Sequence, residues 1–401
     1  MNIILYSHTF LPDVGGREVV MYQLGRALIA RGHTVRVVGP QGFLENRQGA
    51  YDIPIVRYPR LLFGRALSDK YEQGLLELQM MPQLALDIAL RGADVIHSHV
   101  LYPAGYVASL VRKLMPGKAV VLTPHGVDIN VAEDRGYGMR LDGNLRRKID
   151  LALTECDAVT AISEGIFEAL CQTPVENSKI HKIGNGIDLT RFAGTSTLDV
   201  RKTLELPTNA KIILTVGNYT PLKGHEDLIQ AMPFVLKQIP SAKLVIVGAN
   251  TDHLRGLAED LSVGGSVVIT GEMPIPAPHT GAHISPDLLA EIYKTSSVYI
   301  SASNREGAEG LSLSLLDAMA ASLPVVGTNI VGNRDVIENG VNGYLVPPGC
   351  ISSLSSAIVE IFTNDSQAIS MAKESLKIAE KRSWDKVAQQ YEKIYERVLS
   401  K

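Results

Sequence analysis

The chain has 401 residues, of which 45% are hydrophobic and 20% are charged, and its formal net charge is -3 at pH 7. This composition excludes a disordered chain, and the balanced charge gives no support to general nucleic-acid binding. The length suits two or three domains. The 3 cysteines have no CxxC spacing, so they fit a reducing compartment and form no zinc set.

The N-terminal residues lack the basic segment and the apolar run of a signal peptide. No stretch approaches the roughly 20 apolar residues of a membrane-spanning helix. We therefore expect a cytoplasmic protein, with peripheral contact at the inner face of the membrane left open.

Short apolar runs alternate with longer amphipathic stretches along the first half. The clearest helix follows Gly16, where Val20, Leu24 and Leu28 share one face and Gly32 ends the pattern. Strands separated by helices in this way indicate a parallel sheet covered on both faces. The predicted strands are Ile3–Tyr6, Val35–Val38, Val95–His97, Ala119–Thr123, Ala158–Ile162 and Ile180–Ile183.

The same pattern restarts at Ile212, with a helix near Glu226–Lys237 and a charged amphipathic helix from Ser383 to the end. The weakly patterned stretch Gly184–Lys211 is interpreted as a linker. Two doubly wound units are therefore predicted, and such sheets bind ligands at the carboxyl ends of their strands. The strands of the second unit are Ile212–Val216, Leu244–Val247, Val267–Thr270, Val298–Ser301, Pro324–Val326 and Tyr344–Val346.

Two motifs in the first half place polar residues at predicted strand ends. Gly15 and Gly16 open a helix after the first strand, where a ligand can approach the backbone and the helix N-terminus favours an anion. His125 lies at the end of a later strand, at the edge where parallel sheets bind ligands. His97 and His99 share one face of a strand, but no third ligand is in view, so they do not predict a metal site.

Two loops in the second half combine charge with glycine. Lys223 precedes Gly224 in the loop after a strand, where its ammonium and the loop amides favour a phosphate, although the loop is not a Walker A motif. Farther along, a polar loop begins at Asn304 and leads into a helix that starts at Ser312 or Ser314. Loop amides and a helix N-terminus together form an anion site.

Acidic residues flank this second loop. Glu309 lies in the loop and Asp317 lies in the helix that follows. Carboxylates beside an anion are unfavourable unless they bind hydroxyls, as in a ribose diol, or meet a developing positive charge. The alternative interpretation is that they offset the helix dipole.

In this order and at this spacing, the motifs resemble the retaining glycosyltransferases of family 4, and the resemblance covers nearly the whole chain. It implies an α/β fold of two facing Rossmann-like doubly wound domains with an interdomain cleft, the GT-B fold. Residues 1–185 would form the acceptor domain and residues 186–383 the donor domain, and the helix 384–401 would pack back on the first domain. The further segments that carry the resemblance are Asp94–His99, Ala161–Ser163, Gly184–Asp188 with Phe192, Ala318–Ala320, Pro324–Val326 and Asn342–Val346.

The resemblance implies roles by position. Three residues would be catalytic: His125 would contact the donor sugar near the reacting carbon, Lys223 would neutralise the diphosphate, and Glu309 would hold the donor sugar. The remaining donor-binding residues would be Gly16 near the phosphates and the acceptor, Gly271 and Met273 beside the base, Gly310, Leu311, Ser312 and Leu313 around phosphate or sugar hydroxyls, and Asp317 on the ribose.

The implied activity is transfer of a hexose-type sugar, with retention, from a nucleotide diphosphate sugar to a carbohydrate or lipid-linked glycan, as in polysaccharide biosynthesis. A UDP-sugar is favoured as donor over a GDP- or ADP-sugar. No cofactor and no metal is expected, and the sequence has no Asp-x-Asp motif. Front-face substitution would pass through an ion-pair-like state that a cationic cradle stabilises.

Three departures from the family pattern bear on the donor. Asn218 stands where the family usually has an arginine, so Asn218 and Arg305 are both counted among the donor-binding residues, with Arg305 expected to supply the charge from the opposite loop. Asp317 replaces a longer glutamate. The loop Met273–Pro286 is longer than usual and would alter donor choice.

Other functions fit the same pattern. A non-catalytic sugar-nucleotide-binding protein would tolerate Asn218 but would not need intact catalytic candidates. A nucleotide-sugar 2-epimerase would need further acid–base groups, which the sequence does not identify, and an NAD-dependent oxidoreductase would need fingerprint glycines that neither unit has. The basic stretches Arg57–Arg65 and Arg135–Lys148 would suit an anionic membrane surface or a lipid-phosphate acceptor, and an ordinary solvated surface is the simpler interpretation.

Overall fold

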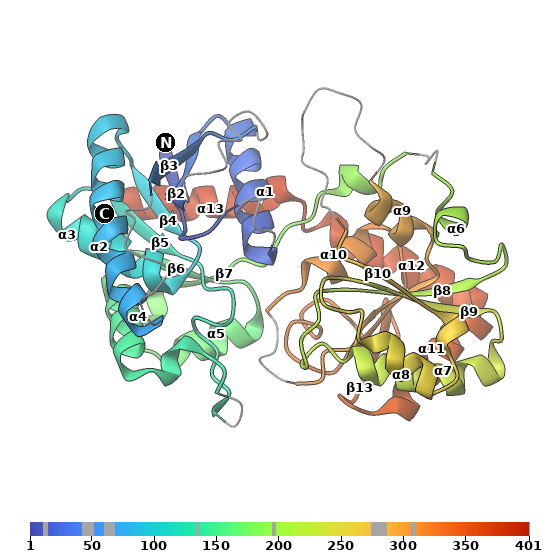
Figure 1. Cartoon of the computed structure of the whole chain (residues 1–401). Helices are drawn as coiled ribbons and strands as arrows, with labels where there is room; N and C mark the ends of the chain where they lie inside the picture. The colour runs from blue at the N-terminus through green and yellow to red at the C-terminus, as the bar shows by residue number, and fades with distance from the viewer. Residues whose placement is uncertain are drawn as a thin grey trace. The chain divides into compact units, whose positions relative to one another are not determined.

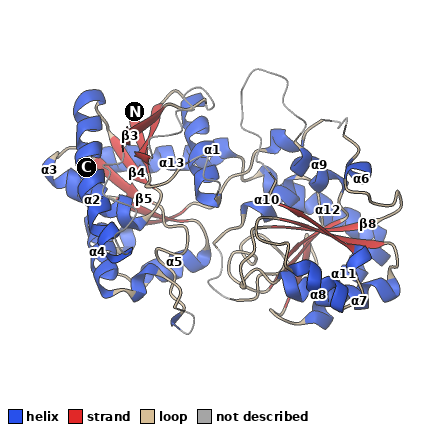
Figure 2. Ribbon diagram, in the orientation of Figure 1, coloured by secondary structure: helices blue, strands red, loops and turns tan. Residues whose placement is uncertain are grey.

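In the computed structural model the chain forms two compact units, and each is a parallel sheet with helices on both faces (Figures 1 and 2). Unit 1 contains Met1–Gly186 and Trp384–Lys401, and unit 2 contains Ile187–Pro276 and His283–Ser383. These two sheets confirm the predicted class, an α/β fold of two doubly wound units. The structure describes residues 1–10, 15–41, 52–59, 69–133, 136–194, 198–273, 287–305 and 310–400.

The sheet of unit 1 has 7 parallel strands in the order β3-β2-β1-β4-β5-β6-β7. The order reverses between β1 and β4, so their carboxyl ends mark the position where open sheets of this kind bind ligands. Strand β3 was not predicted, because its sequence carries Arg57 and a proline, which an edge strand tolerates. The bounds are β1 (Asn2–Tyr6), β2 (Thr34–Gln41), β3 (Ile55–Pro59), β4 (Val95–Ser98), β5 (Ala119–Leu122), β6 (Ala158–Ala161) and β7 (Ile180–Lys182).

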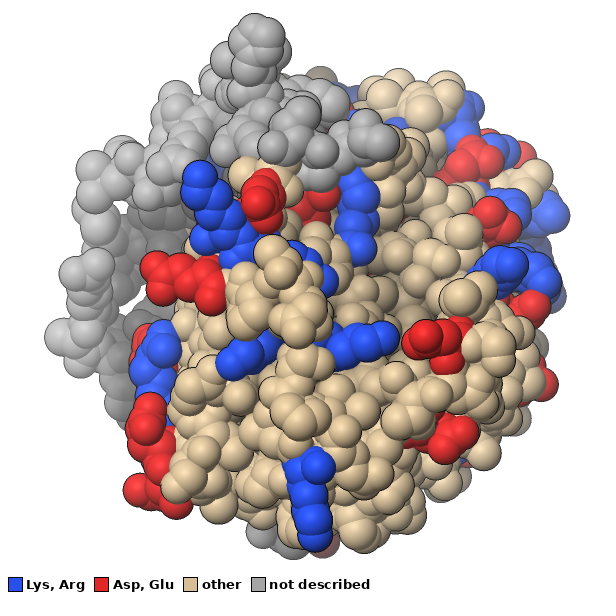
Figure 3. Space-filling model, turned by 90° about the vertical axis from the view of Figure 1, so that its right-hand side faces the viewer, with Lys and Arg blue, Asp and Glu red and all other residues tan. Residues whose placement is uncertain are grey.

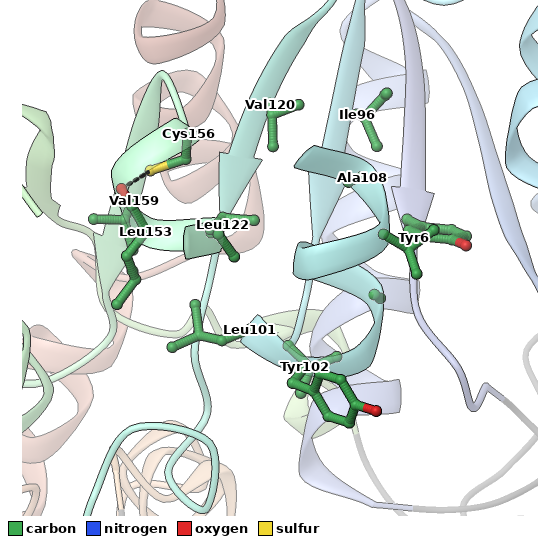
Figure 4. Close-up of a cluster of buried hydrophobic side chains, with 14 of the residues drawn as sticks. Tyr6, Ile96, Leu101, Tyr102, Ala108, Val120, Leu122, Leu153, Cys156 and Val159 are labelled. Atoms are coloured by element: carbon green, nitrogen blue, oxygen red, sulfur yellow. Dashed lines mark hydrogen bonds between the residues drawn. The ribbon is translucent and has the colours of Figure 1, made fainter. Parts of the chain in front are cut away.

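Alternate side chains of these strands enter two different layers. Ile4 and Tyr6 lie in one apolar cluster with α2, α3, α4 and α5, whereas Leu5 lies beneath Gly25 of α1, where an added Cβ would be 3.0 Å from Leu5 Cδ1. Figure 4 shows part of the first cluster, in which the Cys156 thiol donates to the Leu153 carbonyl at 3.2 Å. The helices of unit 1 are α1 (Gly16–Ala30), α2 (Asp69–Arg91), η1 (Leu101–Gly105), α3 (Tyr106–Leu114), η3 (Met139–Leu141), α4 (Gly143–Glu155), α5 (Glu164–Cys171), η4 (Asn177–Lys179) and α13 (Trp384–Leu399).

The helix α13 is part of unit 1 although it follows unit 2 in the chain. Arg31, after α1, pairs with Asp385 at 2.9 Å and with Glu392 at 2.7 Å. Glu392 also meets His33 Nε2 at 2.8 Å. At the start of the helix, an added Cβ on Gly186 would lie 2.6 Å from the Trp384 ring, so the backbone and the indole are in close contact.

The sheet of unit 2 has 6 parallel strands in the order β10-β9-β8-β11-β12-β13. One face of β8, with Ile212 and Leu214, packs with α9, α10 and α12, and the other face, with Ile213, packs with α7, α8 and α11. The order reverses between β8 and β11, so this sheet also has a ligand-binding position at its carboxyl edge. The strands are β8 (Lys211–Val216), β9 (Ala242–Val247), β10 (Val267–Gly271), β11 (Val298–Ser301), β12 (Val325–Thr328) and β13 (Gly343–Val346).

The segment interpreted as a linker is instead packed into unit 2. Phe192, Val200 and Leu206 are buried in the same cluster as β8. The sequence has few apolar residues here and no regular period, which hid short helices that bury one side chain each. The helices of unit 2 are η5 (Leu189–Phe192), α6 (Val200–Thr203), α7 (His225–Gln238), α8 (Leu254–Asp260), η6 (Gly264–Ser266), α9 (Leu288–Thr295), α10 (Leu313–Ala320), α11 (Ile351–Thr363) and α12 (Asp365–Glu380). Within the described residues, none of the helices of either unit combines the length and the hydropathy that a membrane span requires.

Candidate active site

A buried polar network lies beneath the carboxyl edge of the sheet in unit 1. His97 of β4 is fully buried, and both of its ring nitrogens meet hydroxyls: Nδ1 is 2.7 Å from the Tyr395 hydroxyl and Nε2 is 2.7 Å from Thr123 Oγ1. Tyr391 of α13 lies 3.2 Å from the hydroxyl of Thr160 in the same network. Burial and the proximity of His125 lower the pKa of His97 to about 3, so its ring is neutral at pH 7.

His99 and His125 continue this network to the edge of the sheet. The ring centroids of His97 and His99 are 4.2 Å apart, and His99 Nδ1 lies 3.3 Å from His125 Nε2. His125 is partly exposed, whereas His99 is fully buried. Burial and the charge of Arg17 lower the pKa of His125 to about 3. The predicted site residue His125 is therefore a neutral ring at neutral pH, and it can donate or accept a hydrogen bond but carries no charge.

Asp128 holds the loop that carries His125. Its carboxylate accepts hydrogen bonds from the backbone N–H of His125 at 3.1 Å, of Gly126 at 3.2 Å and of Leu101 at 2.8 Å. Asp128 is buried, and burial raises the pKa of its carboxyl. The three donors supply the hydrogen bonds that water would otherwise provide, so Asp128 fixes the backbone beneath His125.

The N-terminus of α1 brings Gly16 and a charged pair to the same edge. The cap residue Gly15 is extended and makes no side-chain cap. Glu18 accepts hydrogen bonds from Arg17 Nη2 at 2.6 Å and from the Thr9 hydroxyl at 2.7 Å. Burial opposes ionisation of Glu18, but the Arg17 charge and these hydrogen bonds bring its pKa below the usual value. Arg17 was not predicted as a site residue, although its position directly after Gly16 was a signal.

In unit 2, Lys223 lies over the end of β8. Its Nζ is 3.9 Å from the position of a Cβ added to Gly217. The turn after it requires glycine, because Gly224 has φ +67 and a Cβ there would lie 2.0 Å from the Ala302 carbonyl oxygen. The loop after β8 is thus pressed against the loop after β11, on the two strands that flank the reversal of strand order.

Asn304 ties these two loops together. Its side-chain Nδ2 donates to the Pro221 carbonyl at 3.1 Å, and its backbone N–H donates to the Leu222 carbonyl at 2.9 Å. Arg305, the next residue, is therefore carried on a backbone that is anchored to the Lys223 loop. The sequence analysis placed Asn304 at the start of this loop but did not predict its anchoring role, because its partners are more than eighty residues earlier in the chain.

Asn218 has a structural contact rather than a free side chain. Its Oδ1 accepts from the Ala249 N–H at 2.9 Å, and the following Tyr219 N–H donates to the Ala249 carbonyl at 2.8 Å. These bonds join the loop after β8 to the loop after β9. The Asn218 amide supplies no charge. Among the predicted donor-binding residues that the structure describes, the cations on this edge are Lys223 and Arg305.

The N-terminus of α10 lies after the loop of Arg305. Ser312 is the cap residue, as one of the two predictions had it, but its hydroxyl bonds to Ser314 Oγ at 2.9 Å and makes no cap hydrogen bond. Tyr299 of β11 donates to the same Ser314 Oγ at 2.9 Å. The segment Gly310–Leu313, predicted to surround phosphate or sugar hydroxyls, precedes and enters the first turn, and the predicted catalytic residue Glu309 lies outside the described residues.

Asp317 on α10 is paired with an arginine that the sequence analysis did not identify. Arg191 Nη1 donates to Asp317 Oδ2 at 2.8 Å, and Arg191 Nε donates to Asp287 at 2.5 Å. Burial raises the pKa of Asp317 to about 6, and Arg191 opposes that increase. One carboxylate oxygen of Asp317, the residue predicted to bind the ribose, is therefore already hydrogen-bonded to Arg191.

Gly271 and Met273 lie at the end of β10, next to the β9 loop. The Gly271 carbonyl accepts from the Gly248 N–H at 2.9 Å. Met273 packs, partly buried, against the core of unit 2. The rest of the long predicted loop, residues 274–286, lies outside the described residues.

Two family models match the chain. The model described as "Glycosyl transferases group 1" matches residues 197–378, and the model described as "Glycosyltransferase Family 4" matches residues 14–191. The two matches follow one another and together span nearly the whole chain. The chain belongs to the glycosyltransferases of family 4, which confirms the resemblance inferred from its motifs.

Individual relatives agree with this assignment. The N-acetyl-alpha-D-glucosaminyl L-malate synthase of Bacillus anthracis is 25% identical over 401 residues, covering 98% of this chain and 96% of the synthase. A GDP-mannose-dependent alpha-(1-6)-phosphatidylinositol monomannoside mannosyltransferase of Mycobacterium tuberculosis is 23% identical over 388 residues, covering 92% and 91%. HepE of Anabaena, solved in complex with UDP, has the same fold, with a TM-score of 0.78, 19% identity and coverage of 99% and 100%.

Proposed function

We propose that this glycosyltransferase moves a hexose-type sugar, with retention of configuration and without a metal, from a nucleotide diphosphate sugar to a carbohydrate or lipid-linked glycan. A UDP-sugar is the favoured donor, and GDP- and ADP-sugars are the alternatives. UDP is supported by HepE, whose structure holds UDP, and GDP by the mycobacterial mannosyltransferase, whose name specifies GDP-mannose.

The observation that carries the proposal is the anchoring of two cationic loops in unit 2. Asn304 bonds the loop of Lys223 through two carbonyl groups, and Arg305 follows it directly. Just beyond lies the first turn of α10, and its cap residue Ser312 makes no side-chain hydrogen bond to the N–H groups of that turn. Two cations and a set of backbone N–H groups at a reversal of strand order suit a diphosphate.

The chemistry follows from this charge distribution. The bond between the anomeric carbon and the diphosphate oxygen breaks, and the acceptor oxygen bonds to the same face of that carbon while its proton passes to a diphosphate oxygen. Lys223 and Arg305 stabilise the negative charge that develops on the leaving group. As the resemblance implies, His125 of unit 1 would bind a hydroxyl of the donor sugar, and Glu309, from the second half of the chain, would hold that sugar.

Peripheral membrane contact is a separate part of the proposal, supported by the acceptor named for the mycobacterial relative. The described part of the basic stretch is largely paired within the chain, because Arg140 meets Asp150 at 3.2 Å and Lys148 meets Glu77 at 2.5 Å. On the face drawn in Figure 3, acidic and basic side chains of the described residues are interspersed. We expect weak binding to anionic vesicles that salt abolishes, and absence of binding at low salt would refute it.

The donor is tested first by thermal shift with UDP, GDP and ADP and several sugars on each, in the presence of EDTA. A ligand that binds only the folded protein must raise the melting temperature. We expect one base to raise it, Lys223→Ala and Arg305→Ala to abolish the increase, and Lys373→Ala, an exposed lysine on α12, to leave it intact. Equal shifts in all three variants would overturn the phosphate assignment.

The reaction is tested by turnover and by product analysis. With the selected donor and a panel of glycan and lipid-linked acceptors, we expect transfer with the anomeric configuration of the donor, measured by NMR of the product. Arg305→Ala is expected to reduce turnover strongly, and near-normal turnover would refute its role. Incubation with donor alone separates the other functions: a changed donor sugar indicates an epimerase, and tight binding without any turnover indicates a non-catalytic binding protein.

A further inference from the structure

The ring of His99 stacks on that of His125, the predicted catalytic residue. The proposed reaction gives His99 itself no role. His99 is fully buried at the end of β4, and its backbone N–H donates to the Tyr6 carbonyl at 3.1 Å. The ring lies against His97, whose own orientation is held by two hydroxyls. His99 therefore presents Nδ1 to His125 Nε2 from a rigid support.

The protonation of this pair follows from hydrogen-bond counting. Burial lowers the pKa of His99 well below its usual value, and the same holds for His125, so each ring carries one proton at neutral pH. In the contact between His99 Nδ1 and His125 Nε2, one nitrogen must carry a proton and the other must not. His99 Nε2 is buried and has no hydrogen-bond partner among the described residues.

Two arrangements satisfy the contact, and they differ in what they leave unpaired. If His99 carries its proton on Nδ1, it donates to His125, and only a lone pair on Nε2 is left without a partner. If His99 carries its proton on Nε2, a buried N–H group is left without a partner. Buried donors without an acceptor are the rarer case in proteins, so the first arrangement is favoured.

We propose that His99 is a positioning residue that holds His125 in the tautomer with its proton on Nδ1, so that His125 acts on the substrate as a hydrogen-bond donor and not as a base. His125 Nδ1 makes no hydrogen bond to the described residues, and the ring is partly exposed. Its N–H is therefore available to a sugar oxygen. The effect on turnover rests on the proposed function, whereas the tautomer does not.

The tautomer is measured directly by long-range proton–nitrogen correlation on the full chain labelled with ¹⁵N-histidine, at neutral pH. The 10 histidines are few enough to assign His125 by the signals that disappear in His125→Asn. We expect a protonated Nδ1 and an unprotonated Nε2. A protonated Nε2 in the unmodified protein would overturn the proposal, whatever the protein catalyses.

A matched pair of variants tests the donor itself. His99→Asn keeps an N–H donor near the position of Nδ1, and His99→Leu keeps the bulk but removes the donor. We expect His99→Asn to retain the Nδ1 tautomer and turnover within a few-fold, and His99→Leu to give mixed tautomers and a kcat reduced by about 10–100-fold, as for other supporting residues. Both should keep the thermal shift with nucleotide, because the two cations proposed to bind the diphosphate, Lys223 and Arg305, lie in unit 2.

The outcomes separate the two proposals. Equal kcat and equal tautomers in the two variants would refute the positioning role of His99. Absence of glycosyl transfer in the unmodified protein would refute the proposed function but leave the spectrum of His125 to decide its tautomer. Since that spectrum needs no variant of His99, a variant that fails to fold does not prevent the test.

Discussion

The close contact at Gly224 allows a quantitative test of how the Lys223 loop is held. We expect Gly224→Ala to destabilise unit 2 for two reasons. A left-handed backbone costs an L-residue about 1–2 kcal/mol, and the new Cβ would meet the Ala302 carbonyl oxygen at 2.0 Å and the carbon at 2.9 Å. Because both neighbours are backbone atoms, the loops after β8 and β11 must separate.

The strain and the displaced loops together should lower the unfolding free energy by about 3–4 kcal/mol. A unit of this size loses about 2–4 °C of melting temperature per kcal/mol, so the expected decrease is about 10 °C. The anchor made by Asn304 loosens with it, so nucleotide binding should weaken as well.

Two other glycines of unit 2 separate the causes. Gly340 has φ +80 with nothing within 4 Å of an added Cβ, so Gly340→Ala reports the backbone strain alone, about 1–2 kcal/mol. Gly256 lies in α8 with open space around it, so Gly256→Ala should stabilise by about 0.5–1 kcal/mol. Calorimetry measures each melting transition, and Trp384, the single tryptophan, reports unit 1 separately by fluorescence.

Gly224→Ala must cost clearly more than Gly340→Ala and must reduce the thermal shift with nucleotide, while Gly340→Ala leaves that shift unchanged. Equal costs would show that the loops of Lys223 and Ala302 are not in contact. If the Trp384 transition alone changed, the substitution would have destabilised unit 1 and not unit 2, which would refute the prediction.

Other expectations follow from the charged and reactive groups. Arg191→Met leaves Asp317 and Asp287 without their cation, so the unfolding free energy should decrease by about 3 kcal/mol in urea titrations; an unchanged midpoint would refute the pairing. The folded state raises the pKa of Asp317 to about 6, above that of an unfolded aspartate, so protonation favours the folded state. The melting temperature should therefore rise as the pH falls from 7 to 5. Asp317→Asn should remove this contribution to the dependence of melting temperature on pH. Hydrogen bonds from neighbouring serines lower the pKa of Cys350 to about 7, so iodoacetamide should label Cys350 faster than the buried Cys156. The labelling rate of Cys350, measured by peptide mass spectrometry, should increase as the pH rises through 7.

Apolar strands were predictable because buried parallel strands are continuous β-branched runs, such as Ile212–Val216 in the second unit. Strand β3 and the helices near Phe192 were not predicted, because they bury too few side chains to give the sequence a hydrophobic period. The same physical reason explains the predicted boundary at a linker: low hydrophobicity indicated a loose segment, whereas tertiary contacts bury it.

The candidate site was predictable where the motif itself supplies the chemistry, as for His125 and Lys223. It was not predictable where a residue works through a distant partner. Arg191 and Asp317 are 126 residues apart, and the side chain of Asn304 reaches 83 residues back to the Lys223 loop. Only the folded chain brings these partners together, so spacing along the sequence carried no signal for them.

The position of α13 has a consequence for the order in which a growing chain completes its parts. Tyr395, which bonds to His97, leaves the ribosome 298 residues after it. All of unit 2 is synthesised in that interval, so the unit with the proposed nucleotide site is complete first. The tyrosine hydroxyls of α13 therefore join the buried histidine network only after every strand and helix of unit 2 has been made.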